Sequence, residues 1–325
     1  MRLTLLSAED LRCALPMAEA IQTMKEAFAA LSAGTAQAPP RIALDVPEQD
    51  AVSLAMPAAI TGRALGAKLV SVFPRNPSHG RAVVNGLMVV LDPETGEPAA
   101  LADGTFLTAW RTGAASGAAT DLLARPEARI GALIGCGAQA RTQLLAITTA
   151  RPLEEVRVYG RNPDGVERFV TEMQPRVDAR LVAAAEPQVA IGGAEVICTA
   201  TTSSTPVLDG DWIDNGAHLN GVGSFTTEMQ EVDSRTVERA RVFIDQRQAA
   251  LEEAGDLVIA EREGKTSRDH WTELGEVVAR EELGRRNDAE VTFFKSVGVA
   301  VQDVAAMAQA LVRAREFGLG REVEF

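Results

Sequence analysis

The sequence predicts an α/β protein in which a doubly wound parallel sheet is inserted into a smaller α+β domain. The 325 residues exceed what one hydrophobic core ordinarily organises, so two domains are expected. Helical patterns followed by strand patterns fill the first part of the chain, whereas strand and helix alternate after Pro126. We therefore expect residues 1–118 with 300–325 to form the α+β domain, and residues 119–299 to form the doubly wound domain.

The N-terminal domain is expected to begin with two helices. Ser7 and Asp10 have the spacing of a capping box at the start of the first helix. A second helix is expected to open at Pro16, because the apolar residues that follow it recur on one helical face. The segment Pro39–Arg41 then forms a turn that leads into strand-like residues.

Antiparallel strands are expected next. Residues 65–72 and 83–91 have the composition of strands, and the turn at Asp92–Gly96 lets the following residues return as a hairpin partner. The segment 105–123 is rich in Ala and free of Pro, so it is expected to form one helix that contains Arg111.

The chain beyond Pro126 is expected to form repeated βα units, which imply a parallel doubly wound sheet. Its expected strands are 129–134, 156–159, 180–183, 195–199, 218–222 and 242–244. Helices are expected at 138–149 and 163–173, with a short one before the fourth strand. The last helix, 299–315, is amphipathic and is expected to pack back on the first domain.

Composition narrows the functional class. The net charge of −13 argues against nucleic acid and anionic membranes as partners, since both favour basic surfaces. No apolar run approaches the roughly 18–20 residues that span a bilayer, and the N-terminus lacks a secretory pattern. Cys13, Cys136 and Cys198 have no metal-ligand spacing and are typical of a reduced compartment. We expect a cytoplasmic enzyme without a metal site.

A glycine-rich segment predicts a dinucleotide site. Ile134–Ala140 has the pattern G-x-G-x-x-A between an apolar strand and a helix. Gly135 permits a tight turn, and Gly137 lets the backbone approach a pyrophosphate at the N-terminus of the helix. Ala138 and Gln139 open that helix and complete the candidate cradle. The alternative is a tight turn in a fold that binds no nucleotide. The favoured interpretation is a Rossmann domain.

Other strand ends supply further cofactor candidates. The second strand ends at Tyr159 and is followed by Arg161 and Asn162, with no acidic residue to accept hydrogen bonds from a ribose. Arg161 therefore favours NADPH, with NADH as the other cofactor, unless it is a solvated surface residue. The loops after the fourth and fifth strands, 195–199 and 218–222, are expected to line the same crevice. They contribute the candidates Thr199, Thr201 and Val222.

Ordered landmarks along the chain identify a family. They are Pro39–Arg41, Gly66–Ser71, Asn85–Met88, Leu107–Ala114, Gly135–Gln139, Glu252–Leu257, Glu273–Glu276 and Phe294–Gly298. With these segments the chain resembles the ornithine cyclodeaminase/mu-crystallin family over nearly its whole length. The resemblance implies a substrate-binding and dimerisation domain around a Rossmann domain, a homodimer, and a place for Lys295 in the cofactor site.

The resemblance also implies a site for a substrate carboxylate. Family members bind it with basic residues that correspond here to Arg41, Lys68 and Arg111. Arginine suits this task because its planar head donates two parallel hydrogen bonds to a carboxylate. Each of the three has an alternative interpretation as an exposed charge or a structural ion pair. Lys68 is the expected catalytic residue.

The branch of the family depends on the loop after the 218–222 strand. In ornithine cyclodeaminases an Asp in this loop assists the amine chemistry, and the corresponding position here is Ser224, which is also a candidate cofactor contact. A serine does not act as a carboxylate base near neutral pH. The loop is more similar to the ketimine reductase branch, which includes mu-crystallin and bacterial Δ1-pyrroline-2-carboxylate reductases. Arg161 agrees, because reductive enzymes commonly draw on NADPH.

The resulting hypothesis is a reductase of cyclic imine acids in proline metabolism. Δ1-pyrroline-2-carboxylate or Δ1-piperideine-2-carboxylate would give L-proline or L-pipecolate, with the proton coming from Lys68 or an ordered water. The enzyme alternatives are an ornithine cyclodeaminase and an NAD-dependent dehydrogenase of amino acids such as alanine. A binding protein for NADPH and small ligands, like mu-crystallin, is the alternative from another class.

Four other polar residues are given lesser roles. His79 follows a Pro-Ser pair near the expected substrate site, and His218 is expected to be a structural histidine. His270 lies in a polar segment and is expected to face solvent. Asp303 lies on the final helix, where it is expected to cap or pair and not to be catalytic.

Overall fold

The computed structural model describes residues 2–324, apart from the side chain of Pro77. The chain forms two compact units, one of residues 1–111 with 299–325 (unit 1) and one of residues 112–298 (unit 2). The first boundary falls within helix α3 (Gly104–Leu123), seven residues before the 118/119 boundary expected from the sequence. The terminal residues Met1 and Phe325 lie outside the described part.

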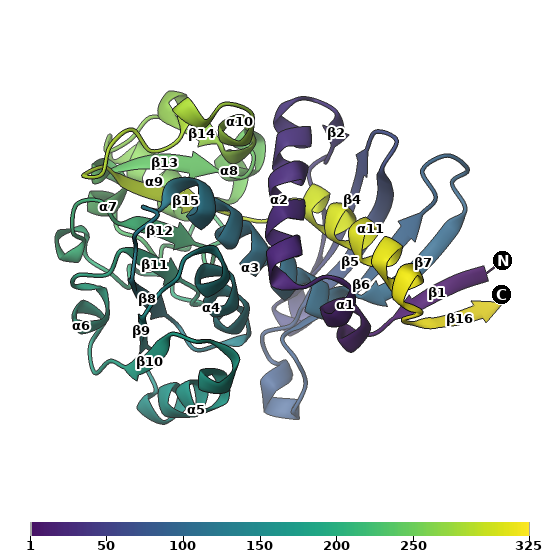
Figure 1. The fold of residues 1–325 in the computed structure, drawn as a ribbon, viewed down its shortest axis with the longest axis horizontal. Helices are drawn as coiled ribbons and strands as arrows, with labels where there is room; N and C mark the ends of the chain where they lie inside the picture. Colours follow the sequence, from purple (N-terminus) through teal and green to yellow (C-terminus); the bar gives the residue numbers. More distant parts are fainter. Residues whose placement is uncertain (1, 325) are drawn as a thin grey trace. The chain divides into compact units, whose positions relative to one another are not determined.

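The described residues of unit 1 form one eight-stranded sheet, which is mostly antiparallel (Figure 1). Its strands are β1 (Arg2–Leu6), β2 (Ala36–Gln37), β3 (Ile42–Val46), β4 (Ala51–Ile60), β5 (Ala64–Val72), β6 (Val84–Leu91), β7 (Pro98–Asp103) and β16 (Arg321–Glu324). They are ordered β16-β1-β7-β6-β5-β4-β2, and β3 also pairs with β4. The hairpin expected across the Asp92–Gly96 turn is confirmed, since β6 and β7 pair antiparallel.

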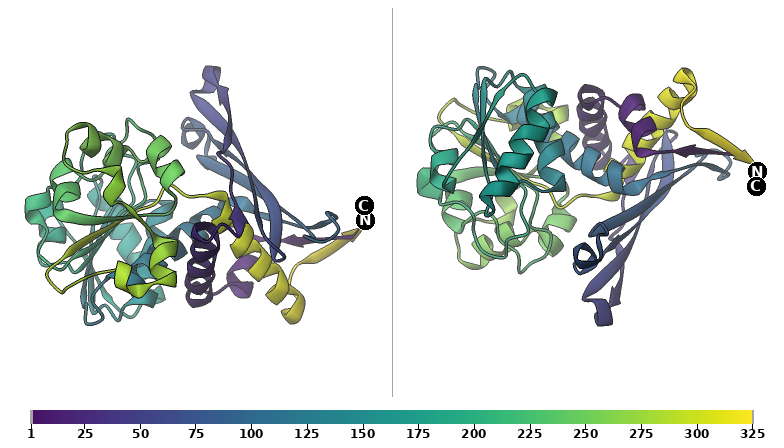
Figure 2. Two further views of the ribbon diagram at one scale, coloured as in Figure 1. Left: turned by 90° about the horizontal axis from the view of Figure 1, so that it is seen from above. Right: turned by 90° about the horizontal axis from the view of Figure 1, so that it is seen from below.

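Three helices cover one face of this sheet. They are α1 (Ala8–Ala14), α2 (Met17–Ser32) and α11 (Ala300–Phe317). Helix α11 contacts β4, β5 and β6 as well as α1 and α2, and both views of Figure 2 place it on the same side of the sheet as α2. The expected capping box is confirmed, because Ser7 and Asp10 each accept the other's backbone N–H.

Strands β1 and β16, and the two-residue β2, have no counterpart in the sequence prediction. Strand β1 precedes the first helix and pairs with β7 and β16, so the two ends of the chain lie side by side (Figure 1). Strand β1 is five residues long and β16 four, and strands this short carry little periodicity of their own. Their pairing with each other, far apart in sequence, stabilises both.

The described residues of unit 2 form a second eight-stranded sheet, in which every pair of neighbours is parallel. Its strands are β8 (Ile130–Ile134), β9 (Glu155–Tyr159), β10 (Arg180–Ala183), β11 (Val196–Thr199), β12 (His218–Gly221), β13 (Ala240–Ile244), β14 (Thr272–Glu273) and β15 (Val291–Lys295). The helices between them are α4 (Ala138–Ala150), α5 (Pro163–Met173), α6 (Pro187–Ile191), α7 (Ser234–Arg239), α8 (Arg247–Glu253), α9 (Gly255–Arg262) and α10 (Leu274–Ala279). The expected doubly wound α/β class is confirmed, although β14 and β15 were not predicted as strands.

The strand order marks the place where a ligand is expected to bind. The sheet runs β10-β9-β8-β11-β12-β15-β13-β14, so successive strands leave β8 in one direction and then resume at β11 on its other side. Ligands of open α/β sheets bind at the carboxyl ends of such neighbouring strands. Alternate residues of β8 feed two cores, with Ala132 and Ile134 on one side and Leu133 on the other. Burial on both faces is typical of parallel sheets.

Candidate functional site

Unit 1 holds a buried cluster of opposite charges. Lys68 Nζ lies 2.9 Å from Asp303 Oδ1 and 2.8 Å from Oδ2, and Arg111 Nε donates to Asp303 Oδ1 at 2.9 Å. Arg111 also donates to the side-chain oxygen of Gln302 at 2.8 Å. Lys68 is 1% exposed, Arg111 4% and Asp303 0%, so these charges are removed from bulk water. We call Lys68, Arg111 and Asp303 the cationic cluster.

Local structure explains why these three residues meet. Strand β5 alternates its side chains, so Lys68 points to the helix-covered face, where Met56 and Met88 of the neighbouring strands flank it. Helix α3 carries Arg111. Asp303 lies in the first turn of α11, where the positive end of the helix dipole favours a carboxylate.

Burial and neighbouring charges shift the pKa values of Lys68 and Asp303. Desolvation lowers the pKa of Lys68 to about 7; Asp303 opposes this shift, while Arg111 and Arg41 add to it. Although burial opposes it, Arg111 and Lys68 hold the pKa of Asp303 below its usual value. Arg41 is half-buried, and its charge is the smallest of these influences on the pKa of Lys68. With Asp303 ionised, the summed charge of the basic residues suits an anionic ligand.

Asp303 is the residue of this cluster that sequence reasoning set aside. The prediction that it pairs on the final helix is confirmed, but its partners are two of the candidate substrate-binding residues. Asp303 lies among the buried Val301, Val304 and Ala305 on the apolar face of the helix. An acid at such a position needs a buried partner, so this pattern is the sequence signal for its ion pairs.

The glycine segment of unit 2 has the shape that a pyrophosphate requires. Gly135 follows β8 with φ +114°, and a Cβ there would lie 2.4 Å from the carbonyl oxygen of Ala200. Gly137 is the N-cap of α4, no side chain caps that helix, and a Cβ on Gly137 would meet nothing within 4 Å. Ala138 and Gln139 form the first turn, so the first backbone N–H groups of α4 have no side-chain cap. These residues fit a dinucleotide.

The end of β9 presents a basic residue. Arg161 and Asn162 are both exposed there, and Asn162 also caps α5 by accepting from the N–H of Gly165 at 3.4 Å. No carboxylate occupies the strand tip at Tyr159–Gly160. This is the local arrangement that accommodates an additional phosphate on the ribose.

Three further cofactor candidates are bound into a buried network. Lys295 Nζ lies 2.9 Å from Asp256 Oδ2 and donates to the hydroxyl of Ser224 at 2.8 Å. Ser224 donates to Asp256 at 2.6 Å. Thr199 donates to Glu231 at 3.1 Å, so its hydroxyl is also engaged. The side chains of Ser224 and Lys295 therefore point into unit 2.

Glu231 and Asp256 were not identified from the sequence. Both are 0% exposed, together with Lys295 and Ser224. Asp256 lies in the Glu252–Leu257 landmark, which was noted without a role. Glu231 follows a polar loop and has no pattern that would separate it from a surface acid. Thr201 and Val222 are half-buried at the ends of their strands.

Two of the three histidines have the burial that the sequence predicts. His218 is fully buried between Thr292 and Asn220, and burial followed by the charge of Arg285 lowers its pKa to about 3. It is therefore a neutral structural residue. His270 is exposed, which confirms the prediction, and His79 is exposed as well.

Within residues 2–324 no group of three or more acidic, His or Cys side chains is arranged to hold a metal.

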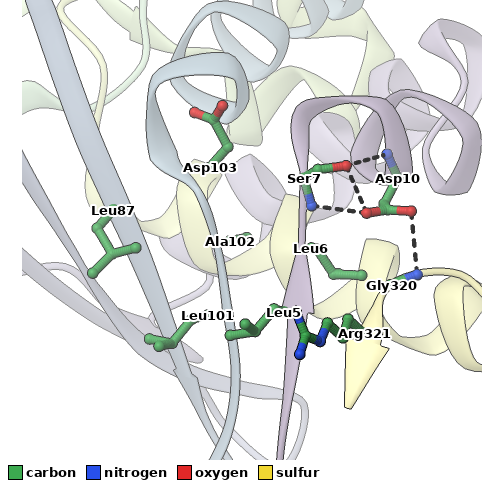
Figure 3. Close-up of a pocket in the computed structure, with 10 residues that line it drawn as sticks. All are labelled: Leu5, Leu6, Ser7, Asp10, Leu87, Leu101, Ala102, Asp103, Gly320 and Arg321. Atoms are coloured by element: carbon green, nitrogen blue, oxygen red, sulfur yellow. Dashed lines mark hydrogen bonds between the residues drawn. The ribbon is translucent and has the colours of Figure 1, made fainter. Parts of the chain in front are cut away.

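A pocket of about 550 Å³ lies elsewhere in unit 1, where β1, β6 and β7 meet the segments around Asp10 and Gly320 (Figure 3). Leu5, Leu87 and Leu101 give it an apolar lining. Its acidic Asp10 is already used by Ser7 and by the N–H of Gly320. None of the predicted site residues lines it.

Among the described residues no helix is both long and apolar enough to cross a bilayer.

A chain with a Rossmann-type unit and a second unit that holds two buried cations on one carboxylate has the features of nicotinamide-dependent enzymes that act on amino-acid-like substrates. The chain belongs to the ornithine cyclodeaminase/mu-crystallin family, whose model matches residues 2–316.

Relatives narrow the comparison. The chain is 37% identical over 324 residues to a Δ1-pyrroline-2-carboxylate reductase of Bacillus cereus, covering 98% of this chain and 99% of the relative. It is also similar to the structure of Thermococcus litoralis Δ1-pyrroline-2-carboxylate reductase in complex with NADH and L-proline, with 38% identity, a TM-score of 0.95, and coverage of 99% and 100%. An archaeal alanine dehydrogenase dimer with bound NAD is 33% identical, with a TM-score of 0.91 and full coverage of both chains.

Proposed function

We propose that this protein is an NAD(P)H-dependent reductase of cyclic imine acids, with Δ1-pyrroline-2-carboxylate as its substrate and L-proline as its product. The observation that carries the proposal is the cationic cluster, because two buried cations on one carboxylate, with Arg41 nearby, suit a small organic acid. The likeness to two reductases of this substrate supports it. The six-membered Δ1-piperideine-2-carboxylate, which gives L-pipecolate, is the second substrate that we expect.

The basic residues act first on the substrate carboxylate. Arg41 and Arg111 bind and orient it, and Lys68 adds its charge when protonated. Binding a carboxylate here offsets the excess positive charge that burial makes costly. Amino acids with a second cationic group, such as ornithine, bring a charge that this cluster repels.

Lys68 is the proposed proton donor. Reduction of C=N to CH–NH consumes one hydride and one proton, and the nicotinamide supplies the hydride to the imine carbon. With its pKa lowered to about 7, the ammonium of Lys68 releases a proton readily near neutral pH. Asp303 holds that ammonium in place through two contacts below 3 Å.

The cofactor is proposed to bind at Gly135 and Gly137, with Ala138 and Gln139 offering backbone N–H groups to its phosphates. We propose that NADPH is preferred and that NADH is also used, because Arg161 stands exposed at the end of β9 without an acidic neighbour in that loop. NADH and NAD in the related structures are consistent with use of both.

A homodimer is proposed through the uncovered face of the unit 1 sheet. Ile42, Leu69 and Leu87 lie in register across β3, β5 and β6 and are 67%, 50% and 43% exposed. Apolar rows of this kind mark interaction surfaces. The related dehydrogenase is described as a dimer. We also propose a cytoplasmic location, which suits three free cysteines.

The proposal is tested by following NADPH absorbance at 340 nm with purified protein and freshly made Δ1-pyrroline-2-carboxylate. Parallel wells hold Δ1-piperideine-2-carboxylate, alanine with NAD, and ornithine with NAD. Rapid loss of NADPH with a cyclic imine, abolished by Lys68→Ala, is the expected result. Turnover of alanine or ornithine, with no turnover of either imine, would refute the proposal and favour a dehydrogenase or a cyclodeaminase.

A further inference from the structure

One buried carboxylate joins the ends of two neighbouring strands in unit 2. Glu231 accepts hydrogen bonds from the backbone N–H of Thr201 and the backbone N–H of Gly223, both at 2.6 Å. It also accepts from the hydroxyl of Thr199 at 3.1 Å. Thr199 and Thr201 belong to the end of β11 and its loop, and Gly223 to the loop after β12. A single side chain thus holds both loops.

Asp256 in turn holds the backbone at Glu231 in place. Asp256 Oδ1 accepts from the backbone N–H of Glu231 at 2.7 Å and from that of Val232 at 2.9 Å. The other oxygen of Asp256 binds Ser224 and Lys295, and Lys295 is the last residue of β15. The ends of β11, β12 and β15 are therefore linked through two carboxylates and one ammonium. We call Glu231, Asp256, Lys295 and Ser224 the strand-end network.

The two loops are packed closely against the Glu231 carboxylate and against the glycine turn. A Cβ on Gly223 would lie 2.4 Å from a carboxylate oxygen of Glu231 and 2.3 Å from the carbonyl oxygen of Thr201. Ala200, between the two threonines that Glu231 binds, touches the glycine turn in the same way, since a Cβ on Gly135 would lie 2.4 Å from its carbonyl oxygen. The β11 loop therefore lies directly against the turn proposed for the pyrophosphate.

The chemistry requires an acceptor at all three contacts. An ionised carboxylate accepts on both oxygens, whereas an amide would turn a donor toward one of these N–H groups. Burial raises the pKa of Glu231, as does Asp256, while Lys295 opposes the rise. The two backbone hydrogen bonds of 2.6 Å are short and charge-assisted, so they offset the cost of burying the carboxylate.

We infer that Glu231 is a positioning residue that holds the β11 and β12 loops in the shape that binds the nicotinamide cofactor. The inference rests on the proposed function, since it assumes that these loops line the cofactor site. Glu231 acts through Thr199, Thr201 and Gly223 and does not itself touch the cofactor.

The test compares Glu231→Gln with Glu195→Gln. Glu195 is a matched control, because it accepts from the N–H groups of Arg129 and Ile130 at 2.6 and 3.1 Å but lies just before β11, at the amino end of the strands. Dissociation constants for NADPH and NADH are measured by the fluorescence of the bound cofactor, alongside thermal unfolding and the KM values for cofactor and imine. Glu231→Gln is expected to weaken cofactor binding roughly tenfold or more, as loss of a buried charge-assisted hydrogen bond implies, with the KM for the imine within about twofold. Glu195→Gln is expected to lower the melting temperature without this change in affinity.

Thr199→Val keeps the inference testable if Glu231→Gln does not fold. Thr199 is 1% exposed, so its hydroxyl acts on the cofactor through Glu231, and loss of this single hydrogen bond of 3.1 Å is expected to lower cofactor affinity roughly three- to fivefold. Thr199→Ser, which keeps the hydroxyl, is expected to recover most of that loss.

The outcomes separate the two proposals. Unchanged cofactor affinity in Glu231→Gln or Thr199→Val, or an equal loss in Glu195→Gln, would overturn the positioning role. Wild-type protein that binds cofactor but reduces neither imine would refute the proposed function alone, and the loop assignment would still be judged by these affinities. Wild-type protein that binds no nicotinamide cofactor would refute both.

Discussion

Replacement of Asp303 by Asn is expected to move the pH dependence of imine reduction. Lys68 is the proposed acid, so the active, protonated form is lost as pH rises through its pKa of about 7. Asp303 opposes the lowering of this pKa through its charge and its hydrogen bond. Asp303→Asn removes that support, so the pKa of Lys68 falls further and the break in kcat/KM moves to lower pH.

The structure sets the size of this effect. The ammonium and carboxylate of this pair are less than 3 Å apart, and both side chains are buried. Two unit charges at 4 Å interact by about 4 kcal/mol at an effective dielectric constant of 20. A third of that energy, about 1.4 kcal/mol, already changes the protonated fraction above the break tenfold. We therefore expect Asp303→Asn to lose roughly tenfold or more in kcat/KM at pH 8.

The assay is the initial rate of NADPH loss with Δ1-pyrroline-2-carboxylate between pH 5.5 and 9. The imine nitrogen also titrates, but its own titration is the same for wild type and variant. Asp121→Asn is the control, because it removes an ion pair to Arg151 of similar length, 2.8 Å, in the other unit. A break at the same pH in wild type and Asp303→Asn would show that Lys68 is not the titrating acid.

Three further predictions concern the cofactor and the assembly. Gly135→Ala should lower both the melting temperature and cofactor affinity, whereas Gly137→Ala, at an unstrained and open position, should lower affinity alone; equal melting temperatures would contradict this. Arg161→Ser should raise the KM for NADPH roughly tenfold and leave that for NADH unchanged, and parallel changes in both would count against a phosphate contact. Leu69→Asp should convert the dimer to monomer by light scattering, and an unaltered mass would exclude this face as the interface.

The sequence was most informative where a backbone pattern and a chemical requirement coincide. The glycine pattern predicted the turn at Gly135, because a positive φ and a close approach to Ala200 both demand glycine. The alternation of β5 placed Lys68 among apolar residues, so its burial followed from the strand. The parallel sheet followed from strand–helix alternation in the same way.

The sequence was least informative where contacts join distant segments. Strands β1 and β16 stabilise each other from opposite ends of the chain, and no local periodicity records that pairing. Asp303 meets Lys68 across 235 residues, and Asp256 meets Ser224 across 32. Glu231 is an acid in a polar stretch, so its burial is decided by the loops that fold over it.

The charge balance of the two buried clusters supports the different roles that we propose for them. In the strand-end network two carboxylates exceed one ammonium, but backbone N–H groups of Thr201, Gly223 and Glu231 satisfy the excess within the protein. In the cationic cluster the excess is positive, and backbone carbonyls do not play the equivalent role in the hydrogen bonds of Lys68 and Arg111 to side chains. A buried excess charge is costly until a counter-charge arrives. The strand-end network is therefore complete without a ligand, whereas the cationic cluster would gain its missing negative charge from the carboxylate substrate that we propose.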